Sequence, residues 1–314
     1  MRAVTVNHFG EMPQVVDLTT PVAGPGQVLI KLAAASMNPM DCTLAAGKWR
    51  PAPVTFPMVL GVDGAGLVEA VGEGTTRFAP GDKVFGQLFI PPVGAFGTYA
   101  EYLAVTADAP LAFVPDGLDL IVAAAAPTAG GAGLSLIEQV EPLDDQVVLI
   151  IGAGGGVGTF ATQFAVRAGA SVSVNINAEA DDRMRSYGVA QTIVRSSESV
   201  AEAMQRTYPE GVDVLIDLVN DARAFSALAR LVRPGGSAIT TQYVADVEAL
   251  RSSGIRGVNF ALRQTSELLQ RVADALTARR VVEPPITRIT LDDAPGMFGP
   301  KAPPRVDGKT VIVL

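Results

Sequence analysis

Cysteine and histidine are nearly absent from the chain, which contains one of each, Cys42 and His8. A disulfide within the chain and a zinc cluster built on cysteines are therefore excluded. A metal site with two histidines is excluded as well. These two counts remove most hydrolytic and metal chemistry from consideration before any motif is read.

Positive charge is also scarce, because 24 Lys and Arg residues stand against 32 Asp and Glu residues and leave a net charge of −8. No Lys/Arg cluster offers the basic face that a nucleic-acid-binding protein presents. Hydrophobic residues make up 48% of the 314 positions and charged residues 18%, so a large core can be buried. We expect a globular protein with no nucleic-acid partner.

Uninterrupted apolar runs of membrane-spanning length are missing. Residues 1–8 alternate as a strand does and lack the apolar run of a signal peptide. Residues 120–137 carry no charge, but Pro127, Gly130 and Gly131 interrupt them. We predict a buried helix with a break there, not a membrane span. The expectation is a cytoplasmic protein with no membrane partner.

Short β-branched stretches separated by turn residues fill the first third of the chain. The predicted strands are residues 3–6, 27–32, 66–71, 83–85 and 99–105. The prolines between them suit loops and edge strands and do not suit a helical bundle. This pattern predicts a compact antiparallel barrel or sandwich.

After about residue 122 the pattern changes to alternating strands and helices. Predicted strands cover residues 147–151, 171–175, 191–194, 212–217 and 236–240, and predicted helices cover 156–168, 179–187, 198–206, 222–231 and 266–278. The strand at 147–151 is continuously apolar, as expected for a parallel strand covered on both faces. Repeated βα units predict a doubly wound parallel sheet, and residues 308–314 return to a strand pattern.

A glycine loop joins the strand at 147–151 to the following helix. Its key residues are Gly152, Gly154, Gly155, Gly156 and Val157. Small residues let the backbone turn tightly and approach a diphosphate, whose charge the exposed N–H groups and the helix dipole favour. A glycine-rich turn without a ligand is the alternative. The buried strand before the loop and the βα units after it favour dinucleotide binding.

The end of the second strand of this region bears on the choice of cofactor. An Asp or Glu there would bind the ribose hydroxyls of NAD and repel a 2′-phosphate, but the sequence has neutral Asn175. Asn177, Arg183 and Arg195 could approach a phosphate, although both arginines could equally be solvated. Glu179, as an acidic residue close to the same place, favours NADH instead. The pattern favours NADPH, with NADH possible.

Several motifs in order then resemble the zinc-independent quinone oxidoreductase branch of the medium-chain dehydrogenase/reductase superfamily. Besides the glycine loop, they are NPMD (38–41), LGVDGAGLV (60–68), FAPGDKVFG (78–86), GTYAEY (97–102), PTA (127–129), DLV (217–219), RPGG (233–236) and GK (308–309). The resemblance covers nearly the whole chain and is specific for the superfamily more than for a substrate.

The resemblance implies an α/β protein with a Rossmann doubly wound parallel sheet and a GroES-like β-rich catalytic domain. The expected domains are residues 1–122 (GroES-like), 123–262 (Rossmann) and 263–314 (return to the catalytic domain), with the active site in the cleft between them. Zinc-dependent relatives use a set of Cys, His and acidic ligands and a lobe with four Cys, and this chain lacks both sets because Cys42 and His8 are isolated, whereas catalytic zinc needs three protein ligands. We therefore expect metal-free hydride transfer from the nicotinamide to a quinone or an α,β-unsaturated carbonyl.

Similarity to the family also assigns candidate site residues. Asn38 and Asp41 would line the site, Asn38 donating its amide to a carbonyl oxygen and Asp41 orienting its neighbours. An Asn-Pro turn stabilised by the Asp side chain is the alternative. Thr128 would contact the nicotinamide region or cap a helix. Val219 is expected at a wall of the cofactor site.

Two aromatic residues complete the candidates. Trp49 could close the substrate pocket or anchor a packed loop. Tyr243 follows the strand at 236–240 and is a possible proton donor, although water could also supply the proton. No metal ligand is expected.

Some expectations concern the periphery. Similar proteins pair through sheet edges, which makes residues 254–262 the expected contact of a homodimer. Pro295, Gly296 and Pro300 interrupt a helix that family members usually carry, so a loop is predicted there. Thr43 and Ala45 stand where relatives often have an aromatic or long polar residue and an arginine. A non-catalytic NADPH-binding or scaffold protein therefore remains the alternative to an NADPH-dependent reductase of a small electrophile.

Overall fold

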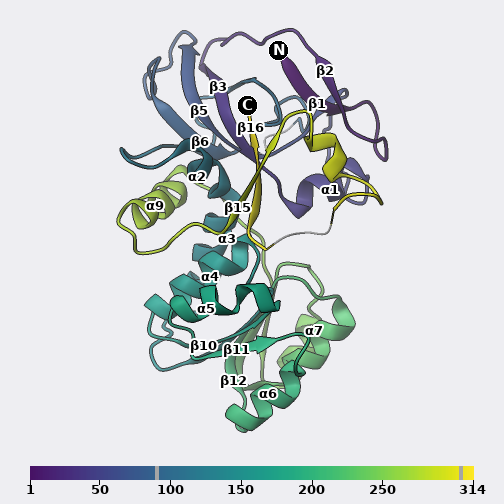
Figure 1. The fold of residues 1–314 in the computed structure, drawn as a ribbon, viewed down its shortest axis with the longest axis vertical. Helices are drawn as coiled ribbons and strands as arrows, with labels where there is room; N and C mark the ends of the chain where they lie inside the picture. Colours follow the sequence, from purple (N-terminus) through teal and green to yellow (C-terminus); the bar gives the residue numbers. More distant parts are fainter. Residues whose placement is uncertain (89–91, 304–306) are drawn as a thin grey trace. The chain divides into compact units, whose positions relative to one another are not determined.

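The computed structural model describes residues 1–88, 92–303 and 307–314 and divides into two compact units. The first unit comprises residues 1–131 and 264–314, and the second comprises residues 132–263. In Figure 1 the first unit runs from the purple N-terminus to teal α2 and resumes with yellow-green α9, and the second unit holds the strands from β9 to β14. Each unit has its own sheet and its own hydrophobic core.

The first unit is built on a mainly antiparallel sheet of seven strands. Six of them follow the order β15-β16-β3-β5-β6-β8, and β7 also pairs with β3. Their bounds are β15 Ile286–Thr290, β16 Lys309–Val313, β3 Gln27–Ser36, β5 Asp63–Val71, β6 Lys83–Gln87, β8 Leu111–Phe113 and β7 Tyr102–Thr106. A smaller sheet has the order β2-β1-β4, with β1 Arg2–Val6, β2 Gln14–Asp17 and β4 Met58–Val59. The antiparallel β-rich domain predicted for the first third of the chain is confirmed.

The first unit also contains short helical segments. They are α1 Pro39–Ala45, α2 Leu120–Ala125, α9 Ser266–Thr277 and the short 3₁₀ turn η2 Ala294–Met297. Thr265 caps α9 by accepting a hydrogen bond from the backbone N of Leu268. The segment with the predicted loop holds only η2 as regular structure, because prolines and glycines prevent a longer helix.

The uncharged stretch at residues 120–137 forms two helices, as predicted. α2 ends at Ala125, and α3 (Pro127–Glu138) begins at a proline. Proline lacks the backbone N–H that continuation of α2 would need and suits the first turn of a new helix. In the described ranges, no helix combines the length and the apolar character needed to cross a bilayer.

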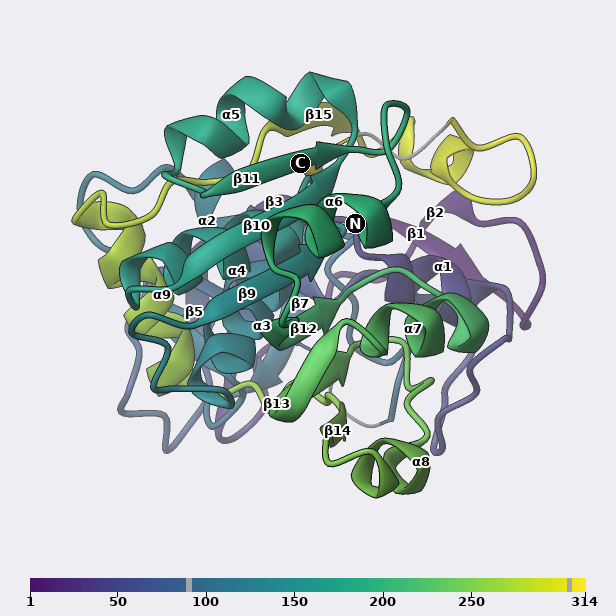
Figure 2. The same ribbon diagram turned by 90° about the horizontal axis from the view of Figure 1, so that it is seen from below.

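The second unit is a parallel six-stranded sheet in the order β11-β10-β9-β12-β13-β14. In chain order its strands are β9 Val147–Ile151, β10 Ser171–Ile176, β11 Gln191–Val194, β12 Val212–Asp217, β13 Val232–Thr240 and β14 Arg256–Asn259. Counted from its first strand this order is 3-2-1-4-5-6, the arrangement of the Rossmann fold. Figure 2 shows β10, β9, β12 and β13 side by side in this sheet.

Helices pack on both faces of the parallel sheet, and β9 in its middle is apolar on both faces. They are α4 Gly156–Arg167, η1 Ala178–Ala180, α5 Asp181–Ser186, α6 Val200–Thr207, α7 Ala222–Ala229 and α8 Val247–Ser252. Val148 and Ile150 of β9 enter the core that includes Ala161 of α4. Leu149 enters the opposite core with Phe225 of α7. Because β9 pairs in parallel with β10 and β12, the carboxyl ends of these strands lie together at one end of the sheet, where the glycine loop begins.

Candidate functional site

The first candidate residues lie at the start of α1 in the first unit. Asn38 precedes the helix in an extended conformation (φ −124°, ψ 152°), and Pro39 occupies the first helical position. Asp41, one turn further on, accepts a hydrogen bond at Oδ2 from the backbone N of Asn38 at 2.7 Å. Buried Leu44 anchors the helix in the core. This local cap holds both Asn38 and Asp41 in place.

A buried tyrosine also fixes Asp41. The Tyr99 hydroxyl donates a hydrogen bond to Asp41 Oδ2 at 2.7 Å, and both side chains are fully buried. Burial raises the pKa of Asp41 to about 7, although the hydrogen bonds from Tyr99 and from the backbone N of Asn38 act against it. Within the described part of the chain, Asp41 Oδ1 is buried without a hydrogen-bond partner. Burial therefore favours the protonated form of this carboxyl group.

Asp63, the first residue of β5, connects Asn38 to Thr128. Its carboxylate accepts a hydrogen bond from Asn38 Nδ2 at 2.9 Å and another from the Thr128 hydroxyl at 2.7 Å. The backbone N of Thr128 lies 3.1 Å from Asp63 Oδ2, and Gln87 Nε2 donates to the Thr128 hydroxyl at 3.0 Å. Burial raises the pKa of Asp63, while nearby Lys309 opposes the rise.

Lys309, the first residue of β16, adds a buried cation to the same place. Its Nζ donates to Asn38 Oδ1 at 2.7 Å and to the Met37 carbonyl oxygen at 2.9 Å, and lies 3.8 Å from Asp63 Oδ2. Burial lowers the pKa of Lys309, and Asp63 and Asp41 counteract this effect. We refer to Asn38, Asp41, Asp63, Tyr99, Thr128 and Lys309 as the Asp63 cluster. A proton on Asp41 leaves the cluster with one carboxylate and one ammonium, which is the least costly charge state in a buried site.

The Asp63 cluster can present one hydrogen-bond donor to a ligand. The carboxamide NH₂ of Asn38 has two hydrogens, and Asp63 takes one of them. Among the described residues no acceptor takes the second hydrogen, and the residue retains 6% exposure. A carbonyl oxygen is the natural acceptor for such a donor, and a developing negative charge on it would strengthen the bond.

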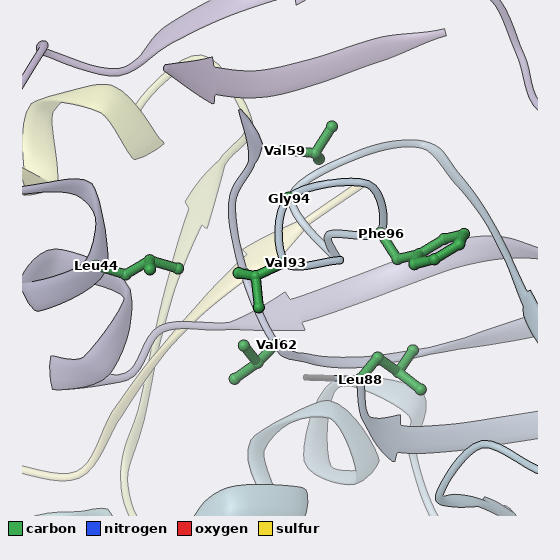
Figure 3. Close-up of a pocket in the computed structure, with 8 residues that line it drawn as sticks. Leu44, Val59, Val62, Leu88, Val93, Gly94 and Phe96 are labelled. Atoms are coloured by element: carbon green, nitrogen blue, oxygen red, sulfur yellow. The ribbon is translucent and has the colours of Figure 1, made fainter. Parts of the chain in front are cut away.

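An apolar pocket lies close in the sequence to the same elements but is far too small for an organic substrate. Its lining residues are Leu44, Val59, Gly61, Val62, Leu88, Val93, Gly94 and Phe96. Figure 3 shows Leu44 reaching it from α1 and Val62 from the segment before β5. Its volume of about 10 Å³ is just that of one water molecule. The pocket is a packing gap.

The glycine loop of the second unit has the geometry of an anion site. Gly152 has φ +84°, which an L-residue adopts only with strain. A Cβ on Gly158 would lie 2.4 Å from the Gly152 carbonyl oxygen, so Gly158 is required for close packing of α4 on the loop. Gly155 is different: a Cβ there would have only that same oxygen nearby, at 3.6 Å. Gly155 caps α4 with no side-chain hydrogen bond, so the helix N-terminus faces open space.

Both arginines named in the sequence analysis lie near the carboxyl ends of the parallel strands of the second unit. Arg183 donates from NH1 to the Thr159 hydroxyl at 2.8 Å and from NH2 to the Gly154 carbonyl oxygen at 3.1 Å. Arg195 donates from Nε to Asn175 Oδ1 at 3.1 Å. Each guanidinium keeps further N–H groups for a ligand. The register Asn175↔Ile151 places the end of β10 beside the strand that leads into the glycine loop.

The remaining candidates differ in their surroundings. Val219 covers the loop, because a Cβ on Gly152 would lie 2.8 Å from Val219 Cγ1. Asn177 is exposed just after β10, and Trp49 is 40% exposed in the first unit. Tyr243 is 63% exposed and has φ +58°, a strained conformation for a non-glycine residue.

The structure thus brings the predicted residues together in two groups, one in each unit. Asn38, Asp41 and Thr128 meet around Asp63, and Arg183 and Val219 meet the glycine loop. Sequence analysis did not assign Asp63, Tyr99 or Lys309 to the site. All three lie in recognised motifs, LGVDGAGLV, GTYAEY and GK, which was the signal available.

Comparison with known proteins places the chain in a class. The model of the alcohol dehydrogenase GroES-like domain matches residues 24–116, and the model described as zinc-binding dehydrogenase matches residues 156–266. These two domains on this fold define the medium-chain dehydrogenase/reductase superfamily. Within it, the chain belongs to the quinone oxidoreductase branch.

Relatives along almost the whole chain support this placement. A quinone oxidoreductase of Lama guanicoe is 32% identical over 291 residues, covering 88% of this chain and 85% of the relative. A 2-methylene-furan-3-one reductase of Solanum lycopersicum is 28% identical over 323 residues, covering 99% of this chain and 79% of the relative. The solved structure of a quinone oxidoreductase from Coxiella burnetii superposes with a TM-score of 0.86 at 26% identity and covers 100% of this chain and 99% of that one.

The residues of this chain do not fit the zinc ion in the description of the second domain model. A catalytic zinc needs three protein ligands, and the chain has one Cys and one His. In residues 1–88, 92–303 and 307–314, no three His, Cys, Asp or Glu side chains gather as a metal site would require. His8 is exposed and faces Glu11 at 4.0 Å.

Proposed function

We propose that this protein is a metal-free reductase that uses NADPH to reduce a quinone or an α,β-unsaturated carbonyl compound. The observation that carries the proposal is the second N–H of the Asn38 carboxamide, held by buried partners and available to a carbonyl oxygen. The names of the relatives, a quinone oxidoreductase and a 2-methylene-furan-3-one reductase, support this substrate class.

The second unit is proposed to bind NADPH. The amides of the glycine loop and the N-terminus of α4 would hold the diphosphate, since Gly155 leaves the space open. Arg183 and Arg195 would bind a 2′-phosphate, and Asn175 and Asn177 would lie near the ribose without repelling it. Glu179 is exposed and would favour NADH, so the two arginines decide the preference.

When bound, the cofactor supplies a hydride, and the protein has to bind and polarise the acceptor. Asn38 would donate to the acceptor oxygen, on which negative charge accumulates as the hydride arrives. Asp41 orients Asn38 through its backbone N, and Thr128 is tied to Asp63 on the other side. No strong base is needed, because a quinone or enone already delocalises the charge. Tyr243 or water would supply the final proton, and Trp49 would contact the substrate.

The direct test mixes the purified protein with NADPH or NADH and a panel of quinones and enones, and follows the nicotinamide absorbance. We expect NADPH oxidation with several acceptors and a smaller rate with NADH. Cofactor binding with no turnover of any acceptor would instead identify a non-catalytic NADPH-binding protein. Failure to bind either cofactor would contradict the proposal as a whole.

The cofactor preference has its own test. Arg183→Ala and Arg195→Ala should each weaken NADPH binding about tenfold, since a charge-assisted hydrogen bond contributes about 1.5–3 kcal/mol. NADH binding should change little. Arg185→Ala is the matched control for Arg183→Ala. Arg185 lies on α5 as Arg183 does, but its side chain donates hydrogen bonds to Asp181 and Thr192. An unchanged NADPH/NADH ratio in both test variants would show that the arginines do not bind the phosphate.

A homodimer is proposed through the edge of the second unit. β14 is the outermost strand of the six-stranded sheet, within residues 254–262, and its free edge can pair with a second copy. Light scattering at micromolar concentration should give twice the chain mass of 32.5 kDa. A monomer mass across the accessible concentrations would contradict this proposal.

A further inference from the structure

Lys309 is a buried cation whose donors are directed at one amide. It lies on β16, which pairs antiparallel with β3 in the register Val311↔Ser36. This pairing brings Lys309 next to the residues that follow β3, and its Nζ donates to the Met37 carbonyl oxygen and to Asn38 Oδ1. With 6% exposure, the ammonium group has given up most of its hydration to reach this position.

Lys309 and Asp63 together allow only one orientation of the Asn38 carboxamide. The observed orientation puts the amide oxygen on the ammonium at 2.7 Å and the amide NH₂ on the Asp63 carboxylate at 2.9 Å. The reversed amide would set an NH₂ donor against an ammonium donor and an oxygen against a carboxylate. In a buried site both contacts are strongly unfavourable.

We infer that Lys309 is a positioning residue of the proposed reductase, which holds Asn38 as a hydrogen-bond donor toward the substrate and so selects substrates that offer an oxygen lone pair. The inference rests on the proposed function. Asn38 can otherwise present either a donor or an acceptor, because its two ends are similar in size. With its oxygen occupied by Lys309, only the donor remains.

The contact with Lys309 also strengthens this donor. An ammonium on the amide oxygen draws electron density from the carboxamide and makes its N–H groups better donors, as in other chains of hydrogen bonds. The benefit grows as the acceptor oxygen becomes negative, so it is larger in the transition state than in the bound substrate. Loss of Lys309 should therefore lower kcat more than it raises KM.

A purely structural role makes a different prediction. If Lys309 only neutralised Asp63, its removal would disturb the fold around β16 whether or not residue 38 is an asparagine. If it acts through Asn38, its removal should have no further effect once the carboxamide is gone. A double-mutant cycle separates the two roles.

The experiment measures kcat and KM for an enone with the full chain and NADPH in wild type, Lys309→Met, Asn38→Ala and the double variant. Loss of a transition-state donor costs about 100-fold in kcat, so we expect that loss for Asn38→Ala and about 10-fold to 100-fold for Lys309→Met. The double variant should match Asn38→Ala. NADPH binding, read by direct titration, should be the same in all four proteins.

Lys309→Gln is the second variant, since it keeps an uncharged donor and should lose less activity than Lys309→Met. If Lys309→Met does not unfold cooperatively, the cycle is built on Lys309→Gln. Losses that multiply in the double variant, or a Lys309 variant with wild-type kcat, would overturn the inference and leave the proposed function standing. A wild-type protein that binds NADPH but reduces no acceptor would overturn both.

Discussion

Replacement of Asp41 by asparagine should remove a pH dependence of stability that the wild-type protein carries. Asp41 is fully buried, and its Oδ2 accepts hydrogen bonds from the Tyr99 hydroxyl and the backbone N of Asn38. The amide oxygen of Asn at position 41 can accept both. The Asp41→Asn variant therefore keeps the shape and these two hydrogen bonds, loses the ionisable group, and places an NH₂ donor where Oδ1 has no partner among the described residues. The cost of that donor does not depend on pH, so the slope still reports the ionisable group.

The magnitude follows from the pKa of Asp41, which burial raises from 3.8 to about 7. Because the folded pKa lies above the unfolded one, the folded state binds the proton more tightly, and stability falls as pH rises from about 4 to about 7. Each unit of pKa difference is equivalent to 1.36 kcal/mol. Between pH 5 and pH 8 the contribution of Asp41 should therefore fall by about 3 kcal/mol.

The assay is urea unfolding of the full chain at pH 5, 6, 7 and 8, followed by the fluorescence of Trp49. Trp49 is the only tryptophan and lies in the first unit, so it reports on the unit that contains Asp41. The unfolding free energy of wild type should fall relative to that of Asp41→Asn as the pH rises, and the difference between the two proteins should change by about 3 kcal/mol between pH 5 and pH 8. Asp63 and Asp41 interact electrostatically, so the difference between the two proteins reports Asp41 together with its coupling to Asp63.

Asp293→Asn is the matched control. Asp293 is exposed, and its pKa is lowered by hydrogen bonds from Thr290. Its replacement should leave the dependence between pH 5 and pH 8 unchanged. If Asp41→Asn showed the same slope as wild type over this range, Asp41 would be ionised throughout, and the reasoning from burial would be refuted.

Other predictions concern the second unit. Gly155→Ala should change the unfolding free energy of the second unit by less than about 1 kcal/mol, because the added Cβ would meet only the Gly152 carbonyl oxygen at 3.6 Å. The same Cβ would fill the space next to the loop, so NADPH binding measured by titration should weaken at least tenfold. Gly158→Ala should instead destabilise the unit by about 1–3 kcal/mol in calorimetry, since its Cβ would meet backbone at 2.4 Å. Tyr243→Gly should stabilise it by about 1 kcal/mol by relieving the positive φ, and an unchanged transition would show no strain there. Tyr243→Phe should lower kcat if the hydroxyl supplies the proton, and wild-type kcat would assign that step to water.

The architecture could be predicted where the sequence pattern was strong. β9 is a continuous apolar run because both faces of the sheet are covered there, and the repeated strand and helix stretches after it identified the remaining parallel strands. Short elements were not predicted. α1 has seven residues, and its stability comes from the Asp41 cap and the packing of Leu44 more than from helix propensity. β14 has four residues with a glycine among them, too short for an alternation to be recognised.

The candidate site was predicted only where a local motif marked it. Asn38 and Asp41 lie within one short motif, and Thr128 lies in another, so the resemblance could assign them. The partners that orient Asn38 also lie in motifs, but a motif does not show which residues contact each other in the fold. Lys309 lies 271 positions from Asn38 in the sequence, and only the pairing of β16 with β3 brings them together. Burial, which sets the proton affinity of Asp41, is likewise a property of the folded unit.

The position of β16 in the sequence has a consequence for how the protein matures. Residues 132–263 form a complete parallel sheet and are synthesised before Lys309, so the second unit can fold during translation. The first unit has to wait for β16, although its earliest strands emerge from the ribosome first. Until then Asp63 lacks its counter-ion, Lys309, and the Asn38 carboxamide can adopt either orientation. The nascent chain would thus fold the unit proposed to bind the nucleotide first and complete the Asp63 cluster, on which the proposed reductase activity depends, only when β16 is inserted.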